Sequence, residues 1–220
     1  MGSTLILNET DLADAIDRLI AAVPEFRHVA NLAGTVPLRS APFDYEGLAY
    51  SIVAQMVSRA SADAIWRRLV AAVATVAPGD ILALDDGAMR AIGLSGAKAQ
   101  ALRALAEACS GAIDFDELRH LPSEAAIARL SAVRGIGAWT AEVFLLFAGG
   151  HPDIFPAGDV ALQAAYGHAF TLENRPNTAA MRKISAAWQP HRSAAARLLW
   201  AYYATCVRSD ASPVAARQKT

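Results

Sequence analysis

Residues 124–147 read EAAIARLSAVRGIGAWTAEVFLLF, and this stretch decides the fold. Apolar residues recur at helical spacing on both sides of Gly135-Ile136-Gly137, so a helix is expected on each side of these three residues. A connector this short permits only a tight reversal, and its glycines can adopt backbone conformations that other residues rarely reach. The stretch therefore predicts a helical hairpin.

The start of the second hairpin helix offers a site for an anion. Its first backbone N–H groups have no acceptor within the helix, and the helix dipole places partial positive charge at the same end. Taken alone, the glycines could equally form the turn of an ordinary helix pair, because such turns are common. In the wider context below, Gly135, Gly137, Ala138 and Thr140 are expected to bind a phosphate group.

Helical periodicity covers nearly all of the 220 residues. The chain is 54% hydrophobic and rich in Ala and Leu, with few clustered β-branched residues, which favours helices over strands. The expected fold class is all-α. Apolar runs fall short of the roughly 20 residues that a membrane-spanning helix needs, so no membrane partner is expected.

Start and stop signals divide the periodic pattern into separate helices. The first is expected to open at Asn8 and to end before Pro24, and a longer pair to break near Ser58–Ala62 and to end at Pro78-Gly79. Further helices are expected over about 86–93, 96–111 and 122–133, and three more after the hairpin, up to about residue 208.

The net charge of −1 argues mildly against a nucleic-acid partner, but the charge is unevenly divided. Residues 1–128 hold 10 Lys/Arg against 16 Asp/Glu, which gives −6, and residues 129–220 hold 10 against 5, which gives +5. A polyanion would meet the C-terminal part, where Arg134, Arg192 and Arg197 are candidate phosphate contacts. An accidental distribution over solvated helix faces is the alternative.

The run from Leu130 to Asp159 resembles the helix-hairpin-helix DNA glycosylase superfamily, and within it the 3-methyladenine DNA glycosylase II family. That family's pattern looks like GIGxWTA, about ten apolar residues, a D-[IV]-F segment and an aspartate. Here these elements are Gly135–Ala141, Asp153-Ile154-Phe155 and Asp159. Together with FDYEGLAYSIVAQMVS, GLSGAKAQALRALA and WQPHRSAAARLLW, the resemblance covers about residues 43–203.

The resemblance implies the compact, two-lobed form of the fold, without the N-terminal β-domain of longer relatives. One lobe is expected over about 44–150, with the hairpin at 124–149, and the other over 1–43 plus 151–220. The implied activity is that of a monofunctional DNA glycosylase in base excision repair. It would flip alkylated purines of the 3-methyladenine type out of double-stranded DNA and hydrolyse the N-glycosidic bond.

Asp159 is the catalytic residue that the resemblance implies. Positive charge builds on the sugar as the glycosidic bond breaks, and a nearby carboxylate lowers that barrier. Asp159 also precedes a helix and could simply cap it, a role compatible with catalysis. Asp153 is expected to be structural. Trp139 stands where bifunctional members carry a Schiff-base lysine, so no AP-lyase activity is expected.

The resemblance also implies a base pocket and a wedge. Trp139 and Trp200 match pocket aromatics, which hold an electron-poor purine by stacking and cation–π attraction, although core packing is the alternative for any tryptophan. Trp66 and Trp188 are assigned to the core, and Val143 and Val160 depart from the family's aromatics, which leaves base preference open. Gln55-Met56 matches the wedge that enters the minor groove and fills the gap left by a flipped base. Burial of Met56 on a helix face is the alternative.

No cofactor is expected to be required. The chain lacks the four clustered cysteines of the iron–sulfur branch, and Cys109 and Cys206 are expected to be buried thiols in a reducing compartment. The hairpin of this family can hold a structural Na⁺ or K⁺ through backbone carbonyls, by position those of Ser131, Val133 and Ile136. A monomer acting on DNA in the cytoplasm, at the nucleoid, is expected.

Two other functions fit the same residues. A glycosylase of this fold could act on deaminated or mismatched bases instead. A DNA-structure binder could keep the hairpin and have no catalysis, and the presence of Asp159 in the matching place argues against it.

Overall fold

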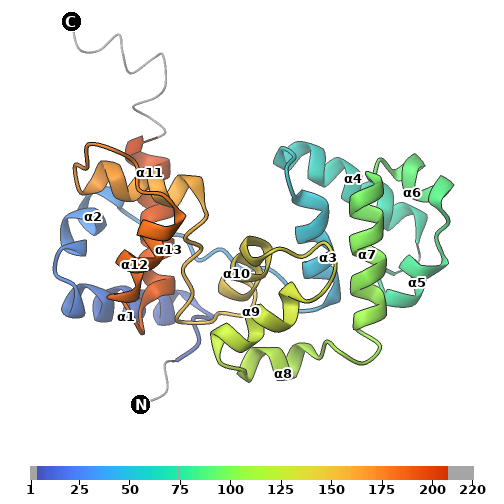
Figure 1. The fold of residues 1–220 in the computed structure, drawn as a ribbon, viewed down its shortest axis with the longest axis horizontal. Coiled ribbons are helices and arrows are strands. Elements are labelled where there is room, and N and C mark those ends of the chain that lie inside the picture. The colour runs from blue at the N-terminus through green and yellow to red at the C-terminus, as the bar shows by residue number, and fades with distance from the viewer. Residues whose placement is uncertain (1–3, 74, 208–220) are drawn as a thin grey trace, which may run out of the picture. The chain divides into compact units, whose positions relative to one another are not determined.

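The computed structural model describes residues 4–73 and 75–207 (Figure 1). Over these residues it consists of helices, turns and loops, without a strand, and the predicted all-α fold class is confirmed. None of the helices in the described part of the chain is both long and apolar enough to cross a membrane.

The chain divides into two compact units. Unit 1 comprises Met1–Arg39 and Gly150–Thr220, and unit 2 comprises Ser40–Gly149, so the divisions fall within a few residues of the expected lobe boundaries. The helices of unit 1 are α1 (Glu9–Ala22), α2 (Phe26–Ala33), α11 (Val160–Ala169), α12 (Thr178–Ala186), α13 (Arg192–Tyr202) and the π-helical turn η1 (Tyr203–Val207). Those of unit 2 are α3 (Tyr45–Ala54), α4 (Arg59–Ala72), α5 (Pro78–Ala83), α6 (Asp86–Ile92), α7 (Gly96–Ala108), α8 (Phe115–His120), α9 (Ser123–Ser131) and α10 (Ala138–Phe147).

Local capping signals set many of the helix starts. Asn8 and Asp11 form a reciprocal capping box at the start of α1. Ser58 accepts a hydrogen bond from the backbone of Ser61 at the start of α4, so the break predicted near Ser58 is confirmed.

Two short helices and one proline differ from the sequence-based expectation. The pattern does not indicate α2, which has 8 residues and buries Phe26 and Val29, or α8, which has 6 residues. The prediction that Pro78-Gly79 ends a helix is wrong, because Pro78 is the first residue of α5. A proline is tolerated there, since the first N–H of a helix has no partner within it.

The core of unit 1 forms around α13, which packs against α1, α2 and α11 (Figure 1). Trp188 lies in an aromatic cluster, with its ring 5.0 Å from Phe26 and 5.2 Å from Phe155 between centroids. It is buried, which confirms its assignment to the core. In unit 2, Trp66 is half-buried and meets the ring of Tyr50 edge-on.

Helix α7 organises unit 2 through its contacts with α3, α5 and α6 (Figure 1). The predicted hairpin is present, with α9 and α10 packed on each other around the turn at Gly135. Gly135 has a φ of +88°, and a Cβ added to it would lie 2.4 Å from the Cβ of Ala101 on α7. Glycine is therefore required at position 135 for two reasons: the backbone conformation of the turn and the close approach of α7.

We predict that Gly135→Ala lowers the free energy of unfolding by about 1–3 kcal/mol, because it adds both left-handed strain and a clash. Gly93→Ala is the matched control, since Gly93 also has a positive φ of +97° but faces the end of the long Arg68 side chain rather than the Cβ and Cα of a packed helix. Urea unfolding of both variants tests this. Equal losses would show that the contact with Ala101 contributes nothing.

Candidate functional site

The loop between α10 and α11 is fastened to the first turn of α13. The buried hydroxyl of Ser193 donates to the carbonyl of His151 (2.6 Å) and accepts from the N–H of Ile154 (2.9 Å). The backbone N–H of Ser193 donates to the carbonyl of Pro152 (3.1 Å). These bonds fix the course of the chain five residues before Asp159.

Asp153 strengthens the same attachment. Its carboxylate accepts two hydrogen bonds from the guanidinium of Arg192, Nε to Oδ1 at 2.7 Å and Nη2 to Oδ2 at 2.9 Å. This two-pronged pair has the geometry that binds a carboxylate most strongly and agrees with a structural role for Asp153.

Two of the three arginines expected to contact phosphate are bound within the protein instead. Arg192 is engaged by Asp153, and Arg197 is buried, with its Nη1 donating to the carbonyl of Arg39. Burial, with a smaller effect of Arg39, lowers the pKa of Arg197 to about 10. The expectation that Arg197 contacts phosphate is wrong, because its guanidinium does not reach the surface. Arg134 is exposed, with its Nη2 donating to Oε1 of Gln100 at 3.0 Å, and its contact with phosphate stays a prediction.

Asp159 is the N-cap of α11, as its position before the helix predicts. Its Oδ1 accepts a hydrogen bond from the backbone N–H of Leu162 at 3.0 Å. The same oxygen accepts one from the indole N–H of Trp200, on α13, at 3.3 Å. Asp159 is half-buried, so two donors orient a carboxylate that solvent still reaches.

A side chain of α11 forms hydrogen bonds with the segment before Asp159. Gln163, one turn into the helix, is buried, and its Nε2 donates to the carbonyl of Ala157 (2.9 Å) and to the hydroxyl of Thr178 (3.3 Å). The backbone N–H of Asp159 donates to the carbonyl of Pro156. The loop that carries the carboxylate is thus held by side chains of α11 and α13.

Unit 2 holds the hairpin residues. Gly137 is the N-cap of α10, and no side-chain hydrogen bond caps this helix. An uncapped helix start agrees with the anion site expected there, which stays a prediction. The hydroxyl of Thr140 is engaged, however, because it accepts a hydrogen bond from Nε2 of Gln55 at 3.0 Å. Because the hydroxyl is the acceptor in this bond, its own O–H still offers a donor for a phosphate oxygen, as the backbone N–H of Thr140 does.

Gln55 and Met56 lie in the turn between α3 and α4. Met56 has a φ of +56° and a relative exposure of 102%, so the alternative that it packs on a buried helix face is wrong. Gln55 is directed instead at the hairpin, with its Nε2 3.0 Å from Thr140 Oγ1 and 3.4 Å from the carbonyl of Gly135. The turn thus presents the apolar side chain of Met56 to solvent, while Gln55 beside it is hydrogen-bonded to the hairpin.

The two candidate pocket tryptophans have different surroundings. Trp139, in the first turn of α10, is 45% exposed. Trp200 is half-buried, and its indole N–H is aimed at Asp159. The structure therefore brings Trp200 and Asp159 together in unit 1, and Gln55, Gly135 and Thr140 together in unit 2.

The residues expected to hold a monovalent cation lie at the end of α9 and in the hairpin turn. The carbonyl of Val133 accepts the N–H of Ile136 at 3.0 Å, and the buried hydroxyl of Ser131 has no hydrogen-bond partner among the described residues. A buried hydroxyl without a partner on one of the three residues is a group that an oxygen-coordinated ion or a water could satisfy. Within residues 4–73 and 75–207, no group of three or more His, Cys, Asp or Glu is placed to hold a metal.

The two cysteines differ from expectation, because Cys109 and Cys206 are both partly exposed rather than buried. Both lie at helix ends, Cys109 after α7 and Cys206 in η1, where packing is less complete than at a helix centre.

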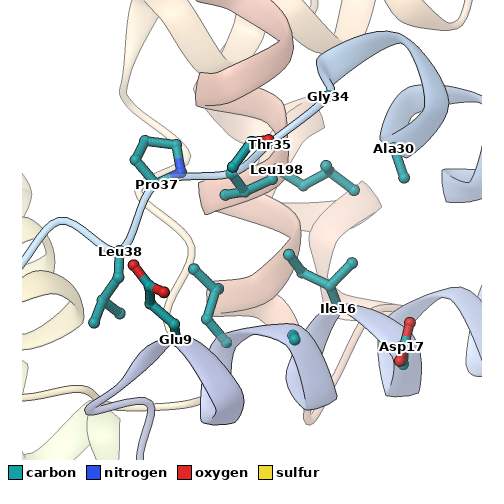
Figure 2. A pocket seen from close by; sticks show the side chains of 12 residues that line it. Glu9, Ile16, Asp17, Ala30, Gly34, Thr35, Pro37, Leu38 and Leu198 are labelled. Carbon is teal, nitrogen blue, oxygen red and sulfur yellow. The ribbon is translucent and has the colours of Figure 1, made fainter.

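A separate cavity of about 590 Å³ lies within unit 1 (Figure 2). Glu9 and Ile16 of α1, the segment 34–38 and Leu198 of α13 line it. Leu198 and Trp200 are two residues apart, so they project from α13 roughly 200° apart. The cavity is therefore on another face of α13 than Asp159.

Sequence reasoning missed Ser193 and Gln163. Ser193 stands in the quoted segment WQPHRSAAARLLW as a polar residue among alanines, and Gln163 stands one helical turn after Asp159. A polar residue on an otherwise apolar helix indicates that its side chain has a hydrogen-bond partner. The sequence does not show which group that partner is.

Comparisons with known proteins agree with this arrangement. The model of the HhH-GPD superfamily of base excision DNA repair proteins matches residues 49–190. DNA-3-methyladenine glycosylase 1 of Schizosaccharomyces pombe is 34% identical over 161 residues, which cover 71% of this chain and 71% of that protein.

Two solved structures are similar along most of their length. The 3-methyladenine DNA glycosylase Mag1 of Schizosaccharomyces pombe, in complex with abasic DNA, has a TM-score of 0.74 and 31% identity, over 85% of this chain and 95% of that one. A DNA-3-methyladenine glycosidase of Bacillus halodurans has a TM-score of 0.80 and 28% identity, over 94% and 95% respectively.

We predict that Ser193→Ala lowers the free energy of unfolding by about 1–3 kcal/mol, because the N–H of Ile154 loses its acceptor inside unit 1. Ser185→Ala is the control: Ser185 is also buried, but its hydroxyl makes a local bond to the carbonyl of Arg182. Thermal unfolding of the two variants checks the prediction. A loss no larger than that of the control would contradict it.

Proposed function

Since this chain belongs to the HhH-GPD superfamily of base excision DNA repair proteins, we propose that it is a DNA glycosylase that removes alkylated purines of the 3-methyladenine type from duplex DNA. The observation that carries the proposal is Asp159, half-buried and oriented by Leu162 and Trp200. The names of the similar proteins from Schizosaccharomyces pombe and Bacillus halodurans support the substrate class. The abasic DNA bound to Mag1 supports a DNA partner.

The chemistry asks little of the protein beyond one carboxylate. Alkylation at a ring nitrogen already makes the purine a cationic leaving group, which departs with the electron pair of the glycosidic bond. Positive charge develops on the sugar, and the carboxylate of Asp159 stabilises it while water adds to the anomeric carbon and releases one proton to the solvent. The two hydrogen bonds to Oδ1 fix the carboxylate in place before the charge develops.

Trp200 then has a second role beside the one expected of it. Its indole N–H holds Asp159, so we assign it to orienting the carboxylate in addition to lining a pocket. Trp139, at 45% exposed, offers an aromatic face on which an electron-poor base can stack.

DNA would be held through its backbone by the hairpin. The N–H groups at Gly135, Gly137, Ala138 and Thr140 suit a phosphate at the start of α10. Na⁺ or K⁺, held by the carbonyls of Ser131, Val133 and Ile136, would add positive charge near that phosphate.

The direct test is release of labelled bases from methylated DNA, resolved by chromatography. We predict that Asp159→Asn folds normally, because the amide oxygen can still accept the N–H groups of Leu162 and Trp200. Base release should fall by roughly a thousandfold or more, because the developing sugar cation loses its counter-charge.

Asp153→Asn is the matched control for that substitution. It should weaken the pair with Arg192 and lower stability, while base release by the folded fraction is retained. Release by Asp159→Asn at the wild-type rate would overturn the assignment.

We also predict that the protein leaves abasic sites intact. With Trp139 in place of a Schiff-base lysine, the product strand should break only on alkali or heat. Sodium borohydride added during the reaction should trap no covalent protein–DNA adduct on a denaturing gel. A trapped adduct would show a lyase step.

The exposed Met56 leads to a prediction about binding. Met56→Ala should leave the melting temperature almost unchanged, because the side chain contributes little to the core. It should weaken binding to duplex that contains an abasic-site analogue, since the gap in the base stack is no longer filled. Leu82→Ala, which truncates another exposed side chain in unit 2, should leave binding unchanged. Wild-type affinity of the Met56 variant, measured by fluorescence anisotropy, would exclude Met56 as the wedge.

A further inference from the structure

The Met56 turn, residues 55–58, holds a strained backbone at an exposed position. Met56 has a φ of +56°, in the left-handed region that residues with a side chain rarely adopt. Its side chain is fully exposed and does not pack in the core. Such conformations persist only where surrounding contacts hold them. The contacts that hold this turn therefore decide where the Met56 side chain points.

Gln55 supplies one of these contacts, on the C-terminal side of α3. Its Nε2 lies 3.0 Å from Thr140 Oγ1 and 3.4 Å from the carbonyl of Gly135. This ties the turn to the hairpin within unit 2.

Lys98 supplies a second contact. From the first turn of α7, its Nζ donates to the carbonyl of Val53 at 2.7 Å, three residues before Met56. Val53 lies in the last turn of α3, where carbonyls have no partner within the helix and carry the negative end of the dipole. Burial lowers the pKa of the Lys98 amino group, as expected for an ammonium drawn partly out of water towards this carbonyl.

We propose that Lys98 is a positioning residue for damaged-DNA binding: it fixes the end of α3 so that Met56 is presented as a wedge. The inference rests on the proposed function, and it assigns Lys98 a role through Met56 rather than through contact with the base or the sugar. Lys98 also stands on the helix that packs against Gly135 through Ala101. One helix thus supports both the wedge turn and the phosphate-binding turn.

The same helix offers a matched control. Arg103 of α7 bonds the carbonyl of Leu84, just after α5, with Nη2 at 2.8 Å, and pairs with Asp86 through Nη1. It is thus a cation on α7 that binds a carbonyl at another helix end, as Lys98 does, but away from the Met56 turn. Arg103→Met removes a comparable structural contact and should leave binding of damaged DNA unchanged.

The test is a double-mutant cycle on affinity for duplex with an abasic-site analogue. Lys98→Met, which keeps the aliphatic stem, should weaken binding roughly tenfold, and Lys98→Arg should restore most of it. In a Met56→Ala background, Lys98→Met should have almost no further effect, because the wedge it positions is already gone. If Lys98 contributed to stability alone, Lys98→Met would change the affinity equally in both backgrounds. Its effect would then not differ from that of Arg103→Met.

Equal losses in both backgrounds, or wild-type affinity of Lys98→Met, would overturn the inference. If Lys98→Met does not fold, Lys98→Gln, whose amide is too short to reach Val53, replaces it in the same cycle. Failure of the proposed function is seen separately in the wild-type protein, as no release of methylated bases and no preference for the abasic duplex over undamaged duplex. If the wild type releases bases but the effects of the Lys98 and Met56 substitutions on affinity are additive, only the role proposed for Lys98 is wrong.

Discussion

Unit 2 depends on one steric constraint, the close approach of α7 to the hairpin turn. A side chain at Gly135 would put its Cβ 2.4 Å from that of Ala101, and the turn's φ of +88° also requires glycine. Because the turn is small, α7 can pass directly beside it. Lys98, one helical turn before Ala101, then reaches the end of α3. The hairpin turn before α10 and the turn that carries the exposed Met56 are therefore both in contact with α7.

In unit 1, polar contacts to α13 have the comparable role. Ser193 and the Asp153–Arg192 pair fasten the loop after α10 to the start of this helix, and Trp200, two turns later, reaches Asp159. A single rigid helix thus sets both the approach of the loop and the orientation of its carboxylate. A residue that must stabilise a short-lived cation benefits from being fixed beforehand, because it needs no rearrangement during the reaction.

The two units divide the proposed work into different kinds of interaction. Unit 2 offers backbone N–H groups and an apolar side chain, which under the proposal would recognise the phosphate backbone and a gap in the base stack rather than a base sequence. Unit 1 offers Asp159, the carboxylate proposed to act on the sugar. The engagement of Arg192 by Asp153 and the burial of Arg197 leave the hairpin, rather than a basic surface on α13, as the principal candidate for phosphate binding.

The sequence by itself determined the all-α class, the hairpin and the place of Asp159 at a helix start, because periodicity, glycine spacing and capping act over a few residues. Short helices such as α2 carry too few repeats for this signal. Only the tertiary structure decided that Trp200 holds Asp159 across 41 residues, that Gln55 bonds Thr140 across 85, and that Lys98 bonds Val53 across 45. It also decided that Arg197 is buried and that Met56 is exposed. These contacts depend on which helices pack together, and a side chain's type and local spacing do not specify a partner that lies far along the chain.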